Sequence, residues 1–116
     1  VDIRVLQGLV GNDPSTLLEF LHEFLASATG LMRGMGELLD TPDWRDITSG
    51  AHRLKSSARS VGARALGAES EFLEDMMGRQ GTTQEQARVR FAKLCRCWES
   101  AAARIAQHIA ALEAQP

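Results

Sequence analysis

His52 is the residue of this sequence with the clearest potential for chemistry, because the helical pattern around it turns its side chain towards water. At roughly 100° per residue, the apolar stripe of its helix is centred between Ala51 and Leu54, and His52 points about 130° away from that centre. A neutral imidazole is a competent nucleophile near pH 7. An exposed histidine can equally be an ordinary polar surface residue, so its neighbours decide between the two interpretations.

The residues that share the outer face with His52 are cations and small polar side chains. Those within one or two turns of it are Arg45, Thr48, Lys55, Ser56 and Arg59. A phosphoryl group on the imidazole would place its oxygens among these cations, and Lys55 is the best placed to bind them. No carboxylate of the same helix joins this face. The alternative interpretation of the charges is an ordinary solvated surface.

Three other groups of residues could do chemistry, and each is incomplete. Glu19 and His22 have the spacing used in di-iron four-helix bundles, but such sites need a second copy of the pair and two further glutamates. The two cysteines lie two residues apart and lack the second ligand pair that zinc needs. The two serines shortly after His52 have no evident oxyanion donors. We therefore expect neither a metal site nor a nucleophilic triad.

Capping signals and apolar spacing predict the helices that position these residues. Asp13-Pro14 and Thr41-Pro42 each place a capping residue before a proline, so each pair should begin a helix. Apolar residues recur at intervals of three and four over 14–38 and over 44–61. Gly62 should end the second of these helices.

Two further helices and a short one complete the pattern. Apolar spacing continues over 66–77, with Phe72 among its apolar positions. The segment 82–85 (TTQE) has the spacing of a capping box, and an apolar stripe follows it over 91–112. A short helix over 3–10 should cover one end of the others.

The order of these elements predicts an all-α fold. No segment alternates strictly between apolar and polar residues, so we expect no strand. Four amphipathic helices joined by short turns bury their stripes most simply as an antiparallel up-down four-helix bundle, with the short N-terminal helix as a cap. At 116 residues, the chain 1–116 is expected to be a single domain.

Composition excludes several classes of protein. Thirteen Lys and Arg against fifteen Asp and Glu give a net charge of −2, which lacks the basic face that nucleic-acid binding needs. A mean hydropathy of −0.18 and the lack of a long apolar run predict no membrane contact by this domain. The sequence shows no secretory signal, which predicts a cytoplasmic protein. It begins at Val1 rather than Met, so we expect a domain of a longer protein.

The segment around and after His52 resembles a known family, the histidine-containing phosphotransfer (HPt) domain of bacterial two-component phosphorelays. The residues that carry the resemblance are 51–58 (AHRLKSSA), 61–63 (VGA), Leu66 and 72–74 (FLE). The helices expected on either side agree, so the resemblance covers most of the chain. Ser56 and Ala68 depart from the family, in which Gly and Cys are common, but a small residue at 56 should still let a partner approach.

The resemblance implies a phosphocarrier rather than an enzyme. His52 would accept a phosphoryl group from the aspartate of one response-regulator receiver domain and pass it to another. The chain would bind no ATP, and the sequence has neither a P-loop nor a kinase-type Gly-rich loop. It would also bind no cofactor itself, and Mg²⁺ is expected from the receiver, because this chain lacks a carboxylate cluster. The residues expected to contact receivers are Arg45, Thr48, Ser56 and Arg59.

Glu74 is expected to lie beside His52. His52 is ten residues before Gly62 and Glu74 is twelve after it, so in an antiparallel pair both have about the same height. By the resemblance, an acceptor at this position holds the imidazole through Nδ1–H and leaves Nε2 to react. The alternative for Glu74 is an ordinary surface carboxylate.

Two other functions fit a helical bundle. One is a binding module that docks a receiver or another signalling partner without carrying phosphate, but the presence of both His52 and Lys55 favours the carrier. The other is the dimerising four-helix unit of a histidine kinase. This chain already holds four helices, so we expect a monomer. We place it in a hybrid sensor histidine kinase, whose membrane anchor would tether the domain.

Overall fold

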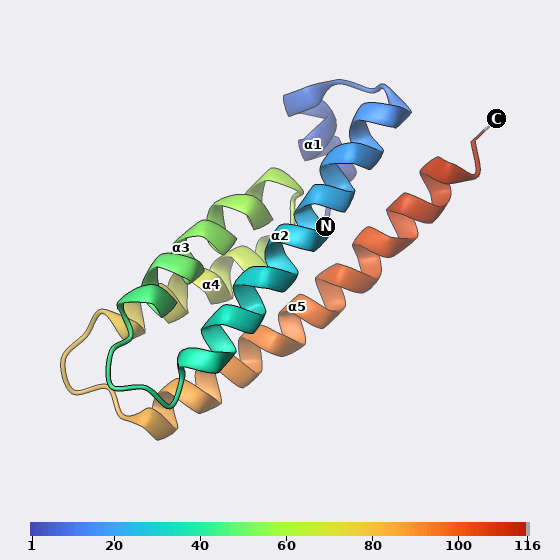
Figure 1. Ribbon diagram of the computed structural model, residues 1–116. Helices are drawn as coiled ribbons and strands as arrows, with labels where there is room; N and C mark the ends of the chain where they lie inside the picture. The colour runs from blue at the N-terminus through green and yellow to red at the C-terminus, as the bar shows by residue number, and fades with distance from the viewer. Residues whose placement is uncertain (116) are drawn as a thin grey trace.

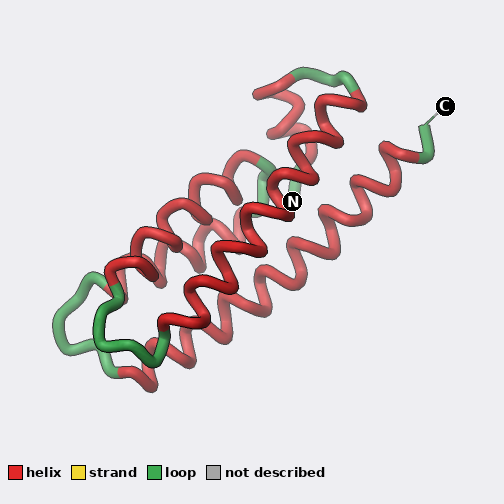
Figure 2. The backbone as a smooth tube through the Cα atoms, viewed as in Figure 1, coloured by secondary structure: helices red, strands yellow, loops and turns green. Residues whose placement is uncertain are grey.

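The computed structural model describes residues 1–115, and over that range the chain forms five helices and no strand (Figure 1, Figure 2). The helices are α1 (Ile3–Val10), α2 (Pro14–Leu38), α3 (Arg45–Ser60), α4 (Arg64–Met77) and α5 (Gln84–Glu113). The all-α fold expected from the sequence is confirmed.

Helices α2 to α5 form an antiparallel bundle in which each lies beside the next along the chain and α5 returns beside α2 (Figure 1). The molecule measures 54 × 20 × 18 Å. With 25 and 30 residues, α2 and α5 extend beyond α3 and α4, which have 16 and 14. Helix α1 folds over the N-terminal end of α2 and also contacts α3. The up-down bundle with a short capping helix is therefore confirmed. Within residues 1–115, no helix combines the length and apolar character that crossing a bilayer requires.

Capping side chains determine where α2 and α5 begin. The Asp13 carboxylate accepts a hydrogen bond from a backbone N–H in the first turn of α2. At the start of α5, Thr83 and Gln86 each accept from the other's backbone N–H in a reciprocal capping box. The box lies one residue later than predicted, because the Thr82 hydroxyl instead donates to the carbonyl oxygen of Met76.

The predicted helix start at Thr41-Pro42 is wrong, because α3 begins at Arg45. The Asp43 carboxylate accepts the backbone N–H of Arg45 at 3.0 Å and so takes the place of the expected cap. The Thr41 hydroxyl donates to the carbonyl oxygens of Leu38 and Asp43. Thr41 therefore closes the turn that ends α2.

The core is built from the apolar stripes of all four long helices. Its buried residues include Leu17, Leu21 and Phe24 of α2, Ile47, Ala51 and Leu54 of α3, Leu66 and Leu73 of α4, and Leu94 and Ile105 of α5. Phe72 differs from the prediction, since it is 43% exposed. The Cζ atom of Arg90 lies 3.6 Å from the centroid of the Phe72 ring, so a cation–π contact covers this phenyl group in place of the core.

The turn between α3 and α4 requires a glycine, as the sequence predicted. Gly62 has φ +68°, a left-handed conformation that side chains disfavour. The backbone N–H of Asp2 donates to the carbonyl oxygen of Val61 at 3.0 Å. A Cβ atom at Gly62 would lie 2.7 Å from the Cβ of Asp2. The N-terminal segment thus packs directly on the turn and holds the α3–α4 hairpin.

Replacing Gly30 and Gly50 with alanine should have different effects, although both glycines lie inside helices. A Cβ at Gly30 meets no atom within 4 Å, so Gly30→Ala should stabilise the protein by about 0.5–1 kcal/mol through helix propensity. A Cβ at Gly50 would lie 3.0 Å from Cγ of Met35, so Gly50→Ala should lose that gain to crowding. Urea unfolding measures both variants. An equal increase in the free energy of unfolding for the two variants would contradict the close packing of α2 against α3 at Gly50.

Leu54→Ala should lower the free energy of unfolding by about 2–5 kcal/mol, since the removed atoms leave a cavity in the core. Leu54 is 0% exposed. The matched control is Val89→Ala, because Val89 is apolar and 61% exposed, and it should change stability by no more than about 0.5 kcal/mol. Circular dichroism during urea unfolding reports both. If Leu54→Ala lowered the free energy of unfolding as little as Val89→Ala, the apolar stripe of α3 would not face the core.

Candidate functional site

His52 lies in the middle of α3 with 60% of its side chain exposed. The neighbouring Ala51 and Leu54 are both fully buried. The imidazole therefore points away from the core, in the direction that the helical spacing predicted. An exposed ring on a regular helix can be approached by another protein without unfolding any part of the bundle.

Glu74 of α4 connects His52 to Lys55 through its two carboxylate oxygens. Its Oε2 lies 2.6 Å from Nδ1 of His52, and its Oε1 accepts a hydrogen bond from Nζ of Lys55 at 2.7 Å. The Glu74 and Lys55 side chains are only 18% and 14% exposed. An ionised carboxylate can only accept hydrogen bonds, so Nδ1 carries a proton, and the tautomer that this selects has its lone pair on Nε2.

The Lys55 ammonium group keeps Glu74 ionised. The hydrogen bond from Lys55 is the largest cause that lowers the pKa of Glu74 below its ordinary value of 4.5. Partial burial acts in the opposite direction, and the hydrogen bond from His52 adds a smaller lowering of this pKa. At neutral pH, Glu74 is therefore a carboxylate that can hold both neighbours at once.

Small side chains let α3 and α4 approach closely beside this site. A Cβ at Gly67 of α4 would lie 3.6 Å from Cγ of Arg59 and 3.9 Å from Cβ of Ala58, both on α3. Ser70 is fully buried, and its hydroxyl donates to the carbonyl oxygen of Leu66 at 2.7 Å. Gly67 and Ser70 were not among the residues that the helical pattern predicted to belong to the site. The sequence feature that could have indicated this close approach is a pair of small residues within the otherwise apolar face of α4.

The cations around His52 are paired with carboxylates, which differs from the free basic cluster that α3 alone predicted. The pairs are Lys55 with Glu74, Arg45 with Asp43 at 2.7 Å, and Arg59 with Glu71 at 3.3 Å. The carboxylates come from α4 and from the loop before α3, so the sequence of α3 did not reveal them. The Arg45 and Arg59 side chains are 90% and 58% exposed. Exposed pairs of this kind contribute little stability and can open for a partner.

Thr48 and Ser56 lie one turn before and one turn after His52. The Thr48 hydroxyl donates to the carbonyl oxygen of Trp44 at 3.2 Å, and the Ser56 hydroxyl donates to that of His52 at 3.4 Å. Both side chains therefore lie against their own helix. Their small size leaves the imidazole open on both sides along α3.

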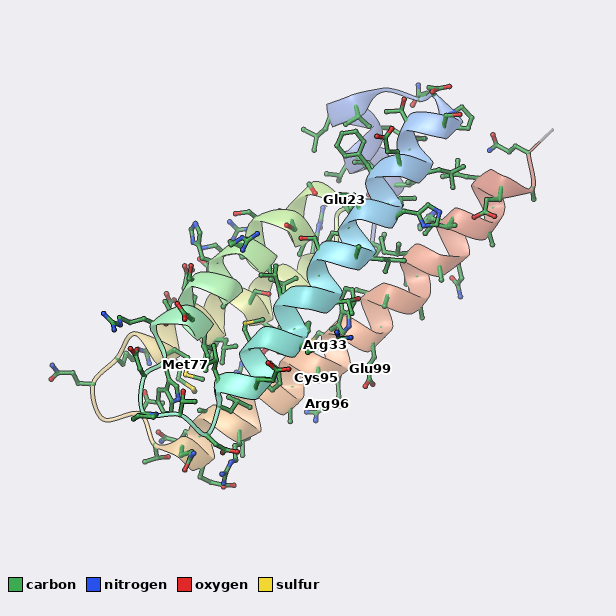
Figure 3. All side chains as sticks on the ribbon, in the orientation of Figure 1. Glu23, Arg33, Met77, Cys95, Arg96 and Glu99 are labelled. Carbon is green, nitrogen blue, oxygen red and sulfur yellow. The ribbon has the colours of Figure 1, made fainter. Side chains whose placement is uncertain are left out.

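A hollow that the sequence pattern did not predict lies beside the site. It has a volume of about 520 Å³, and Trp44, Thr48 and Met77 are among the residues that line it. Met77 lies at the end of the bundle where the chain passes through its loops (Figure 3). Trp44, which the sequence assigned to the core stripe, is half-buried and packs against the core, and its indole N–H donates to the carbonyl oxygen of Leu39 at 3.3 Å. Trp44 thus packs on the core and also lines the hollow, together with Thr48 of the helix that carries His52.

The other candidate groups from the sequence are not assembled into sites. Nε2 of His22 lies 3.8 Å from Oε1 of Glu113, at the far end of the bundle. Among residues 1–115, no three or more His, Cys, Asp or Glu side chains lie close enough together to hold a metal ion, and this includes Glu19. Cys95 and Cys97 are free thiols, and burial raises the pKa of Cys95.

An antiparallel helical bundle whose exposed histidine is bonded to a carboxylate of the neighbouring helix is typical of a histidine phosphotransfer module. A comparison with known protein families matches residues 19–115 to the Hpt domain, and the chain belongs to this family. Hpt domains are phosphocarriers of two-component systems that interact with receiver domains and are not catalytic enzymes. No curated protein and no solved structure matches the chain. The family resemblance seen in the sequence is confirmed.

Glu74→Gln should destabilise the protein by about 1–3 kcal/mol at neutral pH, since Lys55 would lose its counter-ion. The pKa of Glu74 is lowered by folding, so its stabilising contribution is present above pH 4.5 and disappears as the pH falls through the folded-state pKa. The stability difference between the wild type and the variant should therefore shrink in acid.

Urea unfolding at neutral and acidic pH tests this dependence. Asp75→Asn is the matched control, because Asp75 is the exposed carboxylate that follows Glu74 on the same helix. A difference between wild type and Glu74→Gln that stays constant with pH would contradict the ionised bridge.

Proposed function

We propose that this Hpt domain accepts a phosphoryl group on Nε2 of His52 from the aspartyl phosphate of one receiver domain and passes it to the aspartate of another. The observation that supports this most directly is the contact of 2.6 Å between Nδ1 of His52 and Oε2 of Glu74, in a side chain that is 60% exposed. This contact leaves Nε2 as the nucleophilic nitrogen on an accessible ring.

The proposed transfer to the imidazole requires no proton to leave the ring. The Nε2 lone pair forms the N–P bond while the P–O bond to the receiver's aspartate breaks, and the bonding electrons leave with that carboxylate. Nδ1 keeps its proton, so the ring becomes an imidazolium whose positive charge faces Glu74. Positioning and charge stabilisation dominate such reactions. Glu74 contributes both, because it orients the ring and compensates its new charge.

Lys55 is the residue proposed to stabilise the phosphoryl oxygens. It lies three residues after His52 on α3, and its Nζ already bonds the carboxylate that bonds the imidazole. A phosphoryl group on Nε2 brings a second set of anionic oxygens to the same place, and a lysine can turn its ammonium group between two acceptors. Lys55 thus acts first on Glu74 and then on the phosphoryl group.

We propose that the Mg²⁺ ion of the reaction belongs to the receiver domain. Mg²⁺ needs near-octahedral oxygen ligands. The two oxygens of Glu74, which is the carboxylate bonded to His52, are already engaged with His52 and Lys55. This donor set does not suit a Mg²⁺ ion on the side of the Hpt domain, whose own contribution to charge neutralisation is Lys55.

The receiver is proposed to dock over the face that includes Arg45, Thr48, Ser56 and Arg59. The small side chains of Thr48 and Ser56 permit close approach to the imidazole. The hollow beside Trp44 offers a place for a side chain of the receiver. Because both arginines are paired with carboxylates, this face is more evenly charged than a basic ridge and should attract partners with a modest salt dependence.

The proposed setting is a cytoplasmic hybrid sensor histidine kinase in which this domain works as a monomer. Helices α2 to α5 bury their apolar stripes against one another within one chain. The core therefore needs no second copy to close, unlike the dimerising unit of a histidine kinase.

His52→Gln should abolish labelling of the domain by a receiver phosphorylated with ³²P, and the label on the wild type should be lost in acid. His22→Gln is the matched control, because the His22 side chain is also 60% exposed and also faces a glutamate. It should be labelled like the wild type, and both variants should keep the wild-type helical content. A wild-type chain that binds receivers but takes up no label would instead be a docking module and would refute the proposal.

Lys55→Ala should slow phosphoryl transfer by about 10- to 100-fold, the order expected when one charge-stabilising donor is removed. Lys93→Ala is the control, because Lys93 is the other lysine of the chain and pairs with Glu69 on the far side of α4. Rapid-quench kinetics with a phosphorylated receiver measures both rates. Equal rates in the two variants would remove Lys55 from the reaction.

A further inference from the structure

A groove between the start of α4 and the middle of α5 is lined by three arginines and, within residues 1–115, by no carboxylate. The groove has a volume of about 400 Å³, and its arginines are Arg64, Arg96 and Arg104. In the described part of the chain, none of the three has a carboxylate oxygen within 4.0 Å. The cations that do have such a partner are Arg4, Arg45, Lys55, Arg59, Arg88, Arg90 and Lys93.

The helices place these arginines around a common opening. Arg96, Ser100 and Arg104 follow one another at intervals of four on α5, so they share one face over successive turns. Arg96 extends outwards from α5 (Figure 3). Arg64 is the first residue of α4 and reaches the groove from the other wall. The more exposed apolar residues of the lining are Val1, Ala65 and Cys97, while Leu66 and Ala101 are nearly buried beneath them.

The groove is a local excess of positive charge on a protein whose net charge is −2. Asp2 is near Arg64, but its two oxygens are already bonded to the side chain of Arg4. The hydrogen bonds from Arg4 are the main cause that lowers the pKa of Asp2, and the charge of Arg64 is the smallest of the contributions. Asp2 therefore leaves the positive charge of Arg64 largely uncompensated, and the guanidinium groups of the groove are available to an external anion.

We propose that this groove binds a small organic phosphate, at a site separate from the phosphoryl group that His52 carries. Guanidinium groups match phosphate oxygens in a bidentate geometry. A hollow of about 400 Å³ with apolar residues in its lining suits a small ligand that has both charged and apolar parts, such as a nucleotide held only as a ligand and not as the ATP donor that the family resemblance excludes. Arg64 and Glu74 are ten residues apart on α4, which is about 15 Å along the helix axis. The ligand would therefore not reach the imidazole.

Titration of the full chain with adenosine diphosphate tests the proposal by two-dimensional amide NMR and by calorimetry. Saturable shifts should concentrate at residues 63–66 and 96–104. The double variant Arg96→Gln/Arg104→Gln should weaken binding by about tenfold or more, because it removes two charged donors. The control is Arg33→Gln/Arg79→Gln, which removes two other arginines without an ion pair in the described residues. It should leave the Kd within about twofold.

Five results would overturn the assignment. Equal weakening in both double variants, or no saturation at millimolar ligand, would show only unspecific attraction between charges. Inorganic pyrophosphate that binds as tightly as the nucleotide would exclude a contribution of the apolar surface. An oligoglutamate peptide that binds more tightly than the nucleotide would indicate a protein partner. Finally, His52→Gln should bind the nucleotide like the wild type, and a loss there would place the ligand at the phosphotransfer site.

Discussion

The carboxylate of Glu74 is the group on which the rest of the site depends. It uses one oxygen for the imidazole of His52 and the other for the ammonium group of Lys55, at 2.6 and 2.7 Å. A contact between neighbouring helices survives only if their register is constant, and here the register is held by the glycine turn at Gly62 and by its backbone contact with Asp2. Features far from the imidazole thereby determine which ring nitrogen bonds Glu74 and which one the proposed phosphotransfer would use.

Much of this arrangement followed from local rules that the sequence displays. A helix repeats its environment about every 3.6 residues, so the apolar stripe alone located His52 on the outside of α3. A glycine that ends one helix of a hairpin defines where the chain reverses, and counting from Gly62 placed Glu74 at the height of His52. Both inferences need only one helix or one turn, which is why they agree with the structure.

The sequence was less informative where the outcome depends on competition between elements. Thr41-Pro42 carries a good local capping signal, yet the Asp43 carboxylate accepts the first N–H of α3. The pairing of Lys55 with Glu74 could not be read from α3, because the carboxylate comes from another helix. Phe72 has the type and spacing of a core residue, but Arg90 covers its ring at the surface. Such alternative conformations differ little in free energy, and contacts that form only in the assembled bundle determine which one is adopted.

The pairing of Lys55 with Glu74 also affects how strongly the domain would hold a phosphoryl group. In the unphosphorylated domain, the ammonium group of Lys55 is already bonded to the carboxylate of Glu74. A phosphoryl group could bond this ammonium group only by displacing the Glu74 carboxylate. The net change in electrostatic energy would therefore be the difference between two similar ionic contacts. Under the proposed function, such an exchange would bring the phosphorylated and unphosphorylated forms closer in free energy. A relay intermediate needs this property, because it must discharge as readily as it loads.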